Sequence, residues 1–296
     1  MTQHDILCIG AVLWDVIGRS DRVMRVGSDV PGRITRIPGG VAMNIAMTLQ
    51  QFGLRPALLT MIGRDEEGEE LMRAAGRLGC VTDYVYRSDD LPTDIYMAVE
   101  GANGLIAAIA DAHSLEQAGD KILRALSDGT LGSVAAPYDG IIALDGNLTL
   151  DLLSEIASSD IFAKADLRVA PASPGKAERL LPFLMHSRAT LYVNLEEAGL
   201  LTKADHADAP TAAQALIDRG AARVLVTDGG NTAAMGTAEG ILTATPPEVL
   251  VTRVTGAGDT FMAAHIAAER AGENAQDALA AALVAAATYV SGGSPA

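Results

Sequence analysis

Short apolar segments alternate with longer amphipathic segments along most of this 296-residue chain. Such alternation is typical of repeated βαβ units, which build a parallel sheet covered by helices. The predicted strands are residues 6–16, 56–63, 140–146, 166–171, 189–194 and 222–230, each followed by a helix-type stretch. The clearest predicted helices are residues 40–53, 65–79 and 209–220, and each ends at a glycine. The pattern therefore predicts an α/β fold with a central, mostly parallel sheet flanked by helices.

Two regions depart from this alternation. Residues 17–38 are polar and β-like without a helix, and residues 84–110 contain two short apolar runs around a turn at Gly101 to Gly104. We expect these regions to form a small β-sheet that projects from the main sheet as a lid. The sequence shows no internal repeat and no linker, so residues 1–296 are predicted to form one α/β domain with lid segments at about 17–38 and 84–110.

The chain is strongly acidic, with 37 Asp or Glu against 22 Lys or Arg and a formal net charge of −15. This charge repels nucleic-acid phosphates and anionic lipid surfaces, so neither is expected as a partner. Two cysteines, Cys8 and Cys80, are too few for a disulfide framework or a zinc site and indicate buried thiols in a reducing compartment. No leader pattern and no unbroken apolar stretch of about 18 residues occurs, so we expect a soluble, cytoplasmic protein.

A glycine-rich turn, TGAGD, opens a predicted helix near the C-terminus and contains Gly256, Gly258 and Asp259. Glycine is a poor helix former, so its use here indicates that the backbone itself is needed. Free N–H groups at the start of a helix form an anion site. Asp259 has two interpretations, a helix cap or a general base beside a transferring phosphoryl group, and the spacing alone leaves both open.

A second glycine turn precedes the predicted helix at residues 40–53, in the segment PGGVAMNIA. Gly39 and Gly40 form the turn, and Asn44 lies in the first turns of the helix. Its amide is placed to hydrogen-bond a ligand hydroxyl, although a tight turn with a solvated Asn explains the residues equally well. Together the two glycine segments resemble the two signatures of the ribokinase-like (PfkB) family of carbohydrate and nucleoside kinases, and the resemblance covers nearly the whole chain.

This resemblance implies roles for the glycine segments. Asp259 is the expected catalytic base that deprotonates the acceptor hydroxyl, and the N–H groups of Gly256, Ala257 and Gly258 are the expected anion hole. The expected contacts to a sugar substrate are Asp15, Gly39, Gly40 and Asn44. We expect Asp15 at the carboxyl end of the first strand, where open α/β sheets bind ligands. Taken without the family, Asp15 is equally a turn residue.

The resemblance also implies a nucleotide site for ATP and Mg²⁺. Asn194 and Glu197 match the family's N-x-x-E motif, in which Glu197 holds magnesium through water. A single outer-shell carboxylate suits Mg²⁺, which keeps several waters; without the family, Glu197 is a charged residue on a solvated helix face. Thr227 and Gly229 match the strand and turn that touch the nucleotide. A monovalent cation is a further candidate.

Four segments most resemble the pseudouridine kinases of this family, and they are residues 30–49, 96–112, 144–149 and 254–264. This resemblance implies transfer of the ATP γ-phosphate to the 5′-hydroxyl of pseudouridine, with the base recognised in part by the lid. Two alternatives stay open: a kinase of the same family for another nucleoside or sugar, and a non-catalytic nucleoside-binding protein. The lid strands are natural edges for a homodimer.

Two positions depart from the family pattern. Ala170 stands where these kinases commonly have an aspartate before proline, which removes a polar group near the metal or phosphates. After Gly230 the chain has Asn231 and Thr232 where a further glycine is usual, so we expect a differently shaped nucleotide loop. Neither departure involves Asp259. We therefore expect altered affinity rather than lost chemistry.

Overall fold

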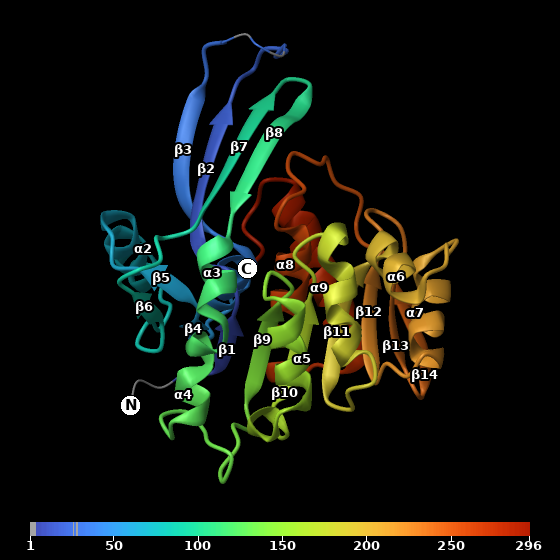
Figure 1. Cartoon of the computed structure of the whole chain (residues 1–296). Coiled ribbons are helices and arrows are strands. Elements are labelled where there is room, and N and C mark those ends of the chain that lie inside the picture. Colours follow the sequence, from blue (N-terminus) through green and yellow to red (C-terminus); the bar gives the residue numbers. More distant parts are fainter. Residues whose placement is uncertain (1–3, 26, 28) are drawn as a thin grey trace.

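A computed structural model describes residues 4–25, 27 and 29–296 of the chain. Residues 26 and 28 of the predicted lid segment, and residues 1–3, lie outside the described residues. The central feature is a sheet of strand order β14-β13-β12-β11-β10-β9-β1-β4 (Figure 1). Its strands are β1 Ile6–Ile9, β4 Pro56–Leu59, β9 Ile141–Asp145, β10 Asp166–Ala170, β11 Ala189–Asn194, β12 Arg223–Thr227, β13 Ala233–Thr237 and β14 Gly240–Ala244. From β4 to β12 all pairings are parallel, which confirms the predicted class of fold.

A separate small sheet rises above the β1 and β4 side of the main sheet (Figure 1). It has the order β3-β2-β7-β8, and its strands are β2 Leu13–Arg19, β3 Arg33–Gly39, β7 Ile95–Gly101 and β8 Gly104–Asp111. The predicted projecting sheet is therefore present. Two further short strands, β5 Met61–Gly63 and β6 Tyr86–Ser88, pair with each other.

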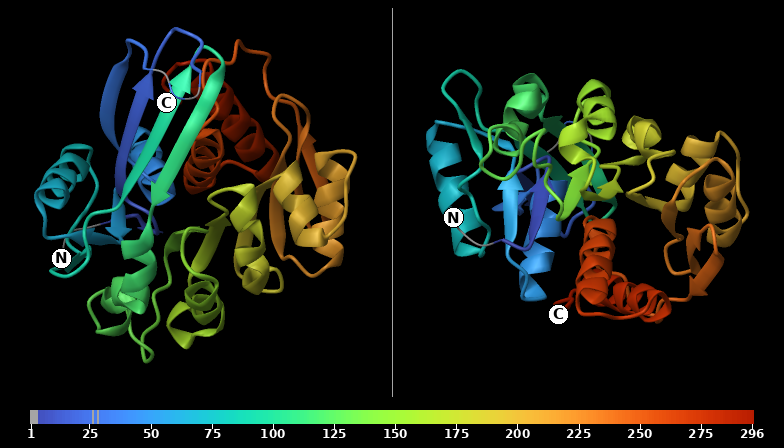
Figure 2. Two further views of the ribbon diagram at one scale, coloured as in Figure 1. Left: turned by 45° about the horizontal axis from the view of Figure 1, so that its top comes forward. Right: turned by 90° about the horizontal axis from the view of Figure 1, so that it is seen from below.

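Helices cover both faces of the main sheet (Figure 2). One face packs against α3 His113–Ala118, α5 Leu150–Ser158, α6 Leu195–Thr202 and α7 Ala209–Asp218. The other packs against α1 Val41–Gln51, α2 Glu66–Arg77, α8 Ala257–Arg270 and α9 Ala275–Val290. The short α4 Arg124–Ser127 and the 3₁₀ helices η1 Gly119–Leu123, η2 Asp160–Phe162 and η3 Pro174–Phe183 complete the fold.

Alternate side chains of β1 enter opposite cores, as the period of a strand requires. Leu7 and Ile9 lie in the core under α3 and α5, whereas Ile6 and Cys8 lie in the core under α1 and α8. Among the described helices, none combines the length and the apolar character that crossing a membrane demands.

The prediction of one strand over residues 6–16 was wrong. β1 ends at Ile9 and β2 begins at Leu13, so the run crosses from the main sheet into the small sheet. The crossing is held by the buried Asp145 carboxylate, which accepts a hydrogen bond of 2.8 Å from Ala11 N. Asp15 consequently lies inside β2 and not at the carboxyl end of a main-sheet strand. The run at 56–63 divides in the same way, into β4 and β5.

A second expectation fails at the opposite edge of the sheet. The strand predicted at 222–230 is followed by an antiparallel hairpin, β13 and β14, and not by a helix. The hairpin has apolar residues at both strands and a turn before Gly240, but each strand has only five residues. Such short runs carry little periodicity from which to distinguish a hairpin from a helix.

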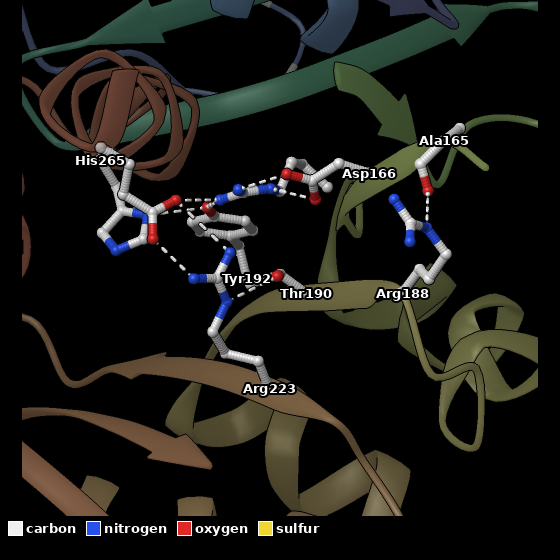
Figure 3. A network of polar contacts seen from close by, with 9 residues as sticks. Ala165, Asp166, Arg188, Thr190, Tyr192, Arg223 and His265 are labelled. Atoms are coloured by element: carbon white, nitrogen blue, oxygen red, sulfur yellow. Dashed lines mark hydrogen bonds and ion pairs between the residues drawn. The ribbon is translucent and has the colours of Figure 1, made fainter. Parts of the chain in front are cut away.

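A buried network of polar contacts fastens α8 to the main sheet (Figure 3). Glu269 of α8 forms ion pairs with Arg168 of β10 and Arg223 of β12. Arg168 also pairs with Asp166 at 2.6 Å and donates to the Tyr192 hydroxyl at 3.1 Å. Burial lowers the pKa of His265 to about 4, so its ring is neutral where its Nδ1 meets the Tyr192 hydroxyl at 2.8 Å. Every charged group of this network has an opposite charge beside it, as burial demands.

Candidate active site

Asp259 lies in the first turn of α8 but does not cap the helix. The N-cap residue is Gly256, and no side-chain cap hydrogen bond is present. Instead, Asp259 Oδ2 accepts a hydrogen bond of 2.9 Å from Asn44 Nδ2 of α1. The cap interpretation is therefore wrong, and the two glycine segments of the sequence meet at this bond.

The backbone before Asp259 has the left-handed conformation that favours glycine, with a φ of +87° at Gly256. The N–H of Ala257 donates to the carbonyl oxygen of Val254 at 3.0 Å, so it is not a free donor in this conformation. The N–H groups of Gly256 and Gly258 have no hydrogen-bond partner among the described residues. Two of the three predicted donors thus remain available for an anion at the positive end of the α8 dipole.

A tyrosine of α9 braces this turn. The Tyr289 hydroxyl donates to the Thr255 carbonyl oxygen at 3.0 Å, and a Cβ at Gly256 would lie only 2.6 Å from that hydroxyl. Arg253 stacks over the Tyr289 ring and donates to the Tyr289 carbonyl oxygen at 2.8 Å. These contacts join the residues before the turn to the end of α9. Sequence reasoning missed both side chains, because nothing near them in the sequence marks a contact over more than 30 residues.

Asp15 lies against the second glycine turn. A Cβ at Gly39 would overlap the Asp15 carboxylate, so only glycine allows this approach. Gly40 is the N-cap residue of α1, and its carbonyl oxygen accepts from the Asn44 N–H at 2.8 Å. The four residues predicted to bind the sugar substrate therefore lie together. Asp15 belongs to the small sheet, and Asn44 belongs to α1.

Burial and mutual repulsion make this site electrostatically unusual. The pKa of Asp259 is raised to about 7, mainly by burial and in part by the nearby carboxylates of Asp145, Asp15 and Glu197, while the Asn44 hydrogen bond opposes the shift. Burial also raises the pKa of Asp15 to about 6. Shifts of this size at a cluster of carboxyl groups are typical of functional sites. The cluster favours a cationic ligand, because a positive charge would relieve the repulsion.

Asn194 and Glu197 form a reciprocal capping box at the start of α6. The Glu197 N–H donates to Asn194 Oδ1 and the Asn194 N–H donates to Glu197 Oε2, both at 2.8 Å. Glu197 is only 7% exposed, so the interpretation as a solvated helix residue was wrong. Its Oε1 has no hydrogen bond within the described residues, which leaves that oxygen for a water or a ligand.

A metal at this site would depend on few protein ligands. No group of three or more His, Cys, Asp or Glu side chains that could hold a metal ion occurs within the described part of the chain. Mg²⁺ commonly binds through one or two carboxylates together with waters and substrate phosphates, so Glu197 and the acidic cluster fit such an ion.

Thr227 ends β12, and Gly229 lies in the turn that follows it. The turn borders an open cleft of about 570 Å³. The lining residues of the cleft are Ala207, Asp208, Pro210, Asp228, Gly230, Asn231, Thr232, Thr243 and Thr245. Asn231 and Thr232, which differ from the family pattern, therefore belong to this surface. Thr232 Oγ1 and Thr245 Oγ1 form a hydrogen bond of 2.9 Å. No hydrogen bond between described residues joins the cleft directly to Asp259 or Asn44.

Sequence reasoning also missed Asp145, which is completely buried at the end of β9. Its carboxylate accepts from Asn147 N at 2.8 Å as well as from Ala11 N, and Lys176 Nζ donates to Asn147 Oδ1 at 2.6 Å. The available signal was a single Asp at the carboxyl end of a predicted parallel strand. Ala170 pairs with Asp145 in the sheet and is itself buried, so its place supplies no polar group.

Glu197 gives the free energy of unfolding a pH dependence of definite sign. Burial raises the pKa of Glu197 from 4.5 to about 7, so the folded protein holds this proton more tightly than the unfolded chain does. The resulting contribution to the free energy of unfolding is complete below about pH 4.5 and is lost as the pH rises to about 7. We expect Glu197→Gln, which keeps an acceptor oxygen, to remove this loss. Between these pH values, the free energy of unfolding of the variant should rise relative to that of wild type by up to about 3 kcal/mol. Urea unfolding of both proteins at each pH measures the difference. If the free energies of unfolding of the two proteins changed with pH in parallel, Glu197 would not be the group responsible for the loss.

Comparison with known proteins supplies the family. Residues 3–296 match the pfkB family carbohydrate kinase. An uncharacterized sugar kinase of Escherichia coli is 29% identical over 231 residues, and the match covers 76% of this chain but only 60% of that relative. The pseudouridine kinase of Escherichia coli is 26% identical over 276 residues, covering 89% of this chain and 83% of that protein.

Solved structures of the same fold agree. A carbohydrate kinase from Agrobacterium tumefaciens superposes with a TM-score of 0.79 at 26% identity, covering 97% of this chain and 90% of that one. A ribokinase of Arabidopsis thaliana, solved with ribose and ATP, superposes with a TM-score of 0.76 at 19% identity, covering 99% and 94%. The chain belongs to the pfkB family of carbohydrate kinases, phosphotransferases whose acceptor is an alcohol group.

Proposed function

We propose that this protein transfers the γ-phosphate of ATP to the 5′-hydroxyl of pseudouridine, giving pseudouridine 5′-phosphate and ADP, with Asp259 as general base. The observation that carries this proposal is the carboxylate of Asp259, bonded to Asn44 and set beside the free N–H groups of Gly256 and Gly258. A base and an anion site at one helix start are the two parts that phosphoryl transfer requires.

The chemical step divides between these groups. Asp259 removes the proton of the acceptor hydroxyl as the hydroxyl oxygen bonds to the γ-phosphorus and the bond to the β-phosphate oxygen breaks. The N–H groups of Gly256 and Gly258 donate to the phosphoryl oxygens, where negative charge is concentrated. The hydrogen bond from Asn44 orients the Asp259 carboxylate toward the acceptor.

The other residues bind the two substrates. Asp15, with Gly39 and Gly40 beside it, accepts hydrogen bonds from the ribose hydroxyls, and Asn44 contributes its amide. Asn194, Glu197, Thr227 and Gly229 belong to the nucleotide side, where the turn after Gly230 completes the surface. Magnesium, when bound with ATP near Glu197, supplies positive charge against the phosphates.

The choice of pseudouridine rests on the resemblance of four segments and on the likeness to the pseudouridine kinase of Escherichia coli over 89% of this chain. The likeness to an uncharacterized sugar kinase favours a bare sugar as the second candidate acceptor. The third candidate is a non-catalytic nucleoside-binding protein. Ala170 and Thr232, which differ from the residues usual in the family, favour this candidate.

A substrate screen tests these candidates. We expect magnesium-dependent release of ADP, measured by a coupled assay, with pseudouridine and not with uridine or ribose. Turnover on ribose alone would select the sugar kinase, and binding of pseudouridine without turnover would select the non-catalytic protein. Mass spectrometry of the product should place the phosphate on the 5′-oxygen.

Replacement of the proposed base tests the mechanism directly. We expect Asp259→Asn to lower kcat by at least about 10²-fold, because the amide cannot accept the proton, while ATP binding is retained. In the wild type, kcat/KM should fall about tenfold per unit below about pH 7, where Asp259 becomes protonated, and this limb should be absent from the residual activity of the variant. A variant with near wild-type turnover excludes Asp259 as the base.

The small sheet serves in this proposal as a lid of a single kinase domain and as a dimer surface. Three side chains on its outer face, the face opposite to that of Asp15, are apolar and exposed: Ile34 at 79%, Met97 at 49% and Ile109 at 68%. The strands β3 and β8 form its edges. Apolar residues clustered on an exposed sheet face are typical of interaction surfaces, and a second copy of the lid would cover them.

The oligomeric state tests the dimer surface. We expect wild type to behave as a dimer in size-exclusion chromatography with light scattering, and Ile109→Glu to behave as a monomer, because a buried charge opposes association. Leu250→Glu, at a residue 82% exposed and outside the small sheet, is the matched control and should remain dimeric. A monomeric wild type, or a dimeric Ile109→Glu, would overturn this assignment.

A further inference from the structure

One row of side chains crosses the small sheet from edge to edge at Asp15. In the strand register, Ile37 of β3 lies opposite Asp15 of β2, Asp15 opposite Tyr96 of β7, and Tyr96 opposite Ala110 of β8. Residues directly opposite each other in neighbouring strands project from the same face of a sheet. The proposed ribose-binding carboxylate is therefore flanked by an aromatic ring and an aliphatic side chain.

This face of the small sheet is the one directed at the candidate active site. Asp15 reaches the Gly39 turn at the start of α1, which also carries Asn44. The opposite face is occupied differently, since Arg36 stacks over the Trp14 ring there, 4.4 Å from its centroid. Trp14 Nε1 in turn donates to the Glu67 carbonyl oxygen of α2 at 3.0 Å. Tyr96 and Asp15 thus share the inner face, and Met97, the next residue along β7, belongs to the outer face.

Among the described residues, Tyr96 differs from the other tyrosines in having neither a hydrogen bond nor a ring contact. The other five contact a ring or a charge, or form a hydrogen bond; they are Tyr84, Tyr86, Tyr138, Tyr192 and Tyr289. The half-buried Tyr96 makes no hydrogen bond and no ring contact within the described residues. Burial and the Asp15 carboxylate raise its pKa, which keeps the hydroxyl neutral and able to donate.

Along β7 and toward β8, the neighbours of Tyr96 on the inner face are small, whereas Asp15 and Ile17 lie on its β2 side. Ala98 follows it by two residues on β7, and Ala108 and Ala110 lie opposite on β8. On this side of the ring, the alanines leave room for an apolar ligand. A nucleobase stacks on surfaces of this kind, since every base has a π-face.

We propose that Tyr96 is the platform on which the nucleobase stacks while Asp15 holds the ribose, so that it makes this protein select a nucleoside over a bare sugar. The inference rests on the proposed function in taking the acceptor to be a nucleoside. It adds a residue that discriminates between substrates, and it assigns that role to the inner face of the small sheet. Loss of the ring should weaken nucleoside binding and leave ribose binding unchanged.

Three variants separate this role from others. Tyr96→Ala removes the ring, Tyr96→Phe keeps it without the hydroxyl, and Met185→Ala truncates a side chain that is 81% exposed and lies outside the small sheet. Calorimetry with pseudouridine in the absence of ATP gives Kd, and kinetics give kcat, KM and the inhibition constant of ribose. We expect Tyr96→Ala to raise Kd and KM for pseudouridine by about tenfold or more, the scale of one base–aromatic stack, with kcat at saturation within about twofold.

The controls decide the interpretation. Tyr96→Phe should stay within about threefold of wild type, Met185→Ala should equal wild type, and the inhibition constant of ribose should be the same in all proteins. Equal Kd values for Tyr96→Ala and wild type would overturn the inference, as would an equal loss of ribose binding, which would show that Tyr96 acts by positioning Asp15. Because binding is measured without ATP, a wild type that binds pseudouridine without phosphorylating it refutes the kinase proposal alone. A wild type that phosphorylates pseudouridine, together with a Tyr96→Ala variant that binds pseudouridine as tightly as wild type, refutes the platform alone.

Discussion

The position of α8 on the main sheet is the constraint on which the candidate site depends. This helix carries Asp259 in its first turn and Glu269 near its end, and Glu269 is fixed between Arg168 of β10 and Arg223 of β12. When one end of a helix is held in place, the position of the other end is also restricted, because the backbone hydrogen bonds within the helix keep it rigid. The buried ion pairs therefore determine how far Asp259 reaches toward Asn44 of α1. A charged anchor of this kind resists sliding, since a displaced Glu269 would leave the partly buried Arg223 without its carboxylate partner and Arg168 with Asp166 alone.

The site is built mainly from carboxyl groups, although its proposed substrate ATP is an anion. Asp15, Asp145 and Glu197 lie close enough to Asp259 for their charges to raise its pKa. Free N–H groups at Gly256 and Gly258 offer a favourable field without adding a formal positive side chain. The carboxyl groups disfavour a free phosphate and favour one that arrives together with a cation. The electrostatics thus agree with a metal–nucleotide complex as the ligand, and the raised pKa of Asp259 places its proton exchange near neutral pH.

Much of this arrangement could be predicted from the sequence, and the failures have physical causes. The pairing of Gly39 and Gly40 with Gly256 and Gly258 indicated two turns that open helices, and the structure joins those helices through Asn44 and Asp259. The run at 6–16 was misread because apolarity reports burial and does not report which sheet a residue joins. The burial of Glu197 was missed because its reciprocal cap with Asn194 has the same residue types as an exposed helix start. Asp145 and Tyr289 act through contacts far apart in the sequence, which local patterns do not contain.

Assignment of Asp15 to the small sheet changes how the two halves of the site are related. Had Asp15 ended a main-sheet strand, acceptor and base would share one rigid frame. Instead the acceptor residue Asp15 and the proposed platform Tyr96 lie on β2 and β7, whereas Asp259 lies on α8. The connection between them is short, because β3 ends at Gly39 and α1 begins at Val41. Asn44, three residues after Val41, bonds Asp259. On the proposed function, a substrate that binds both Asp15 and Asn44 joins the small sheet to α1 and α8, and its hydroxyl meets Asp259 where these three elements come together. Binding of the acceptor and assembly of the catalytic geometry are in this way a single event.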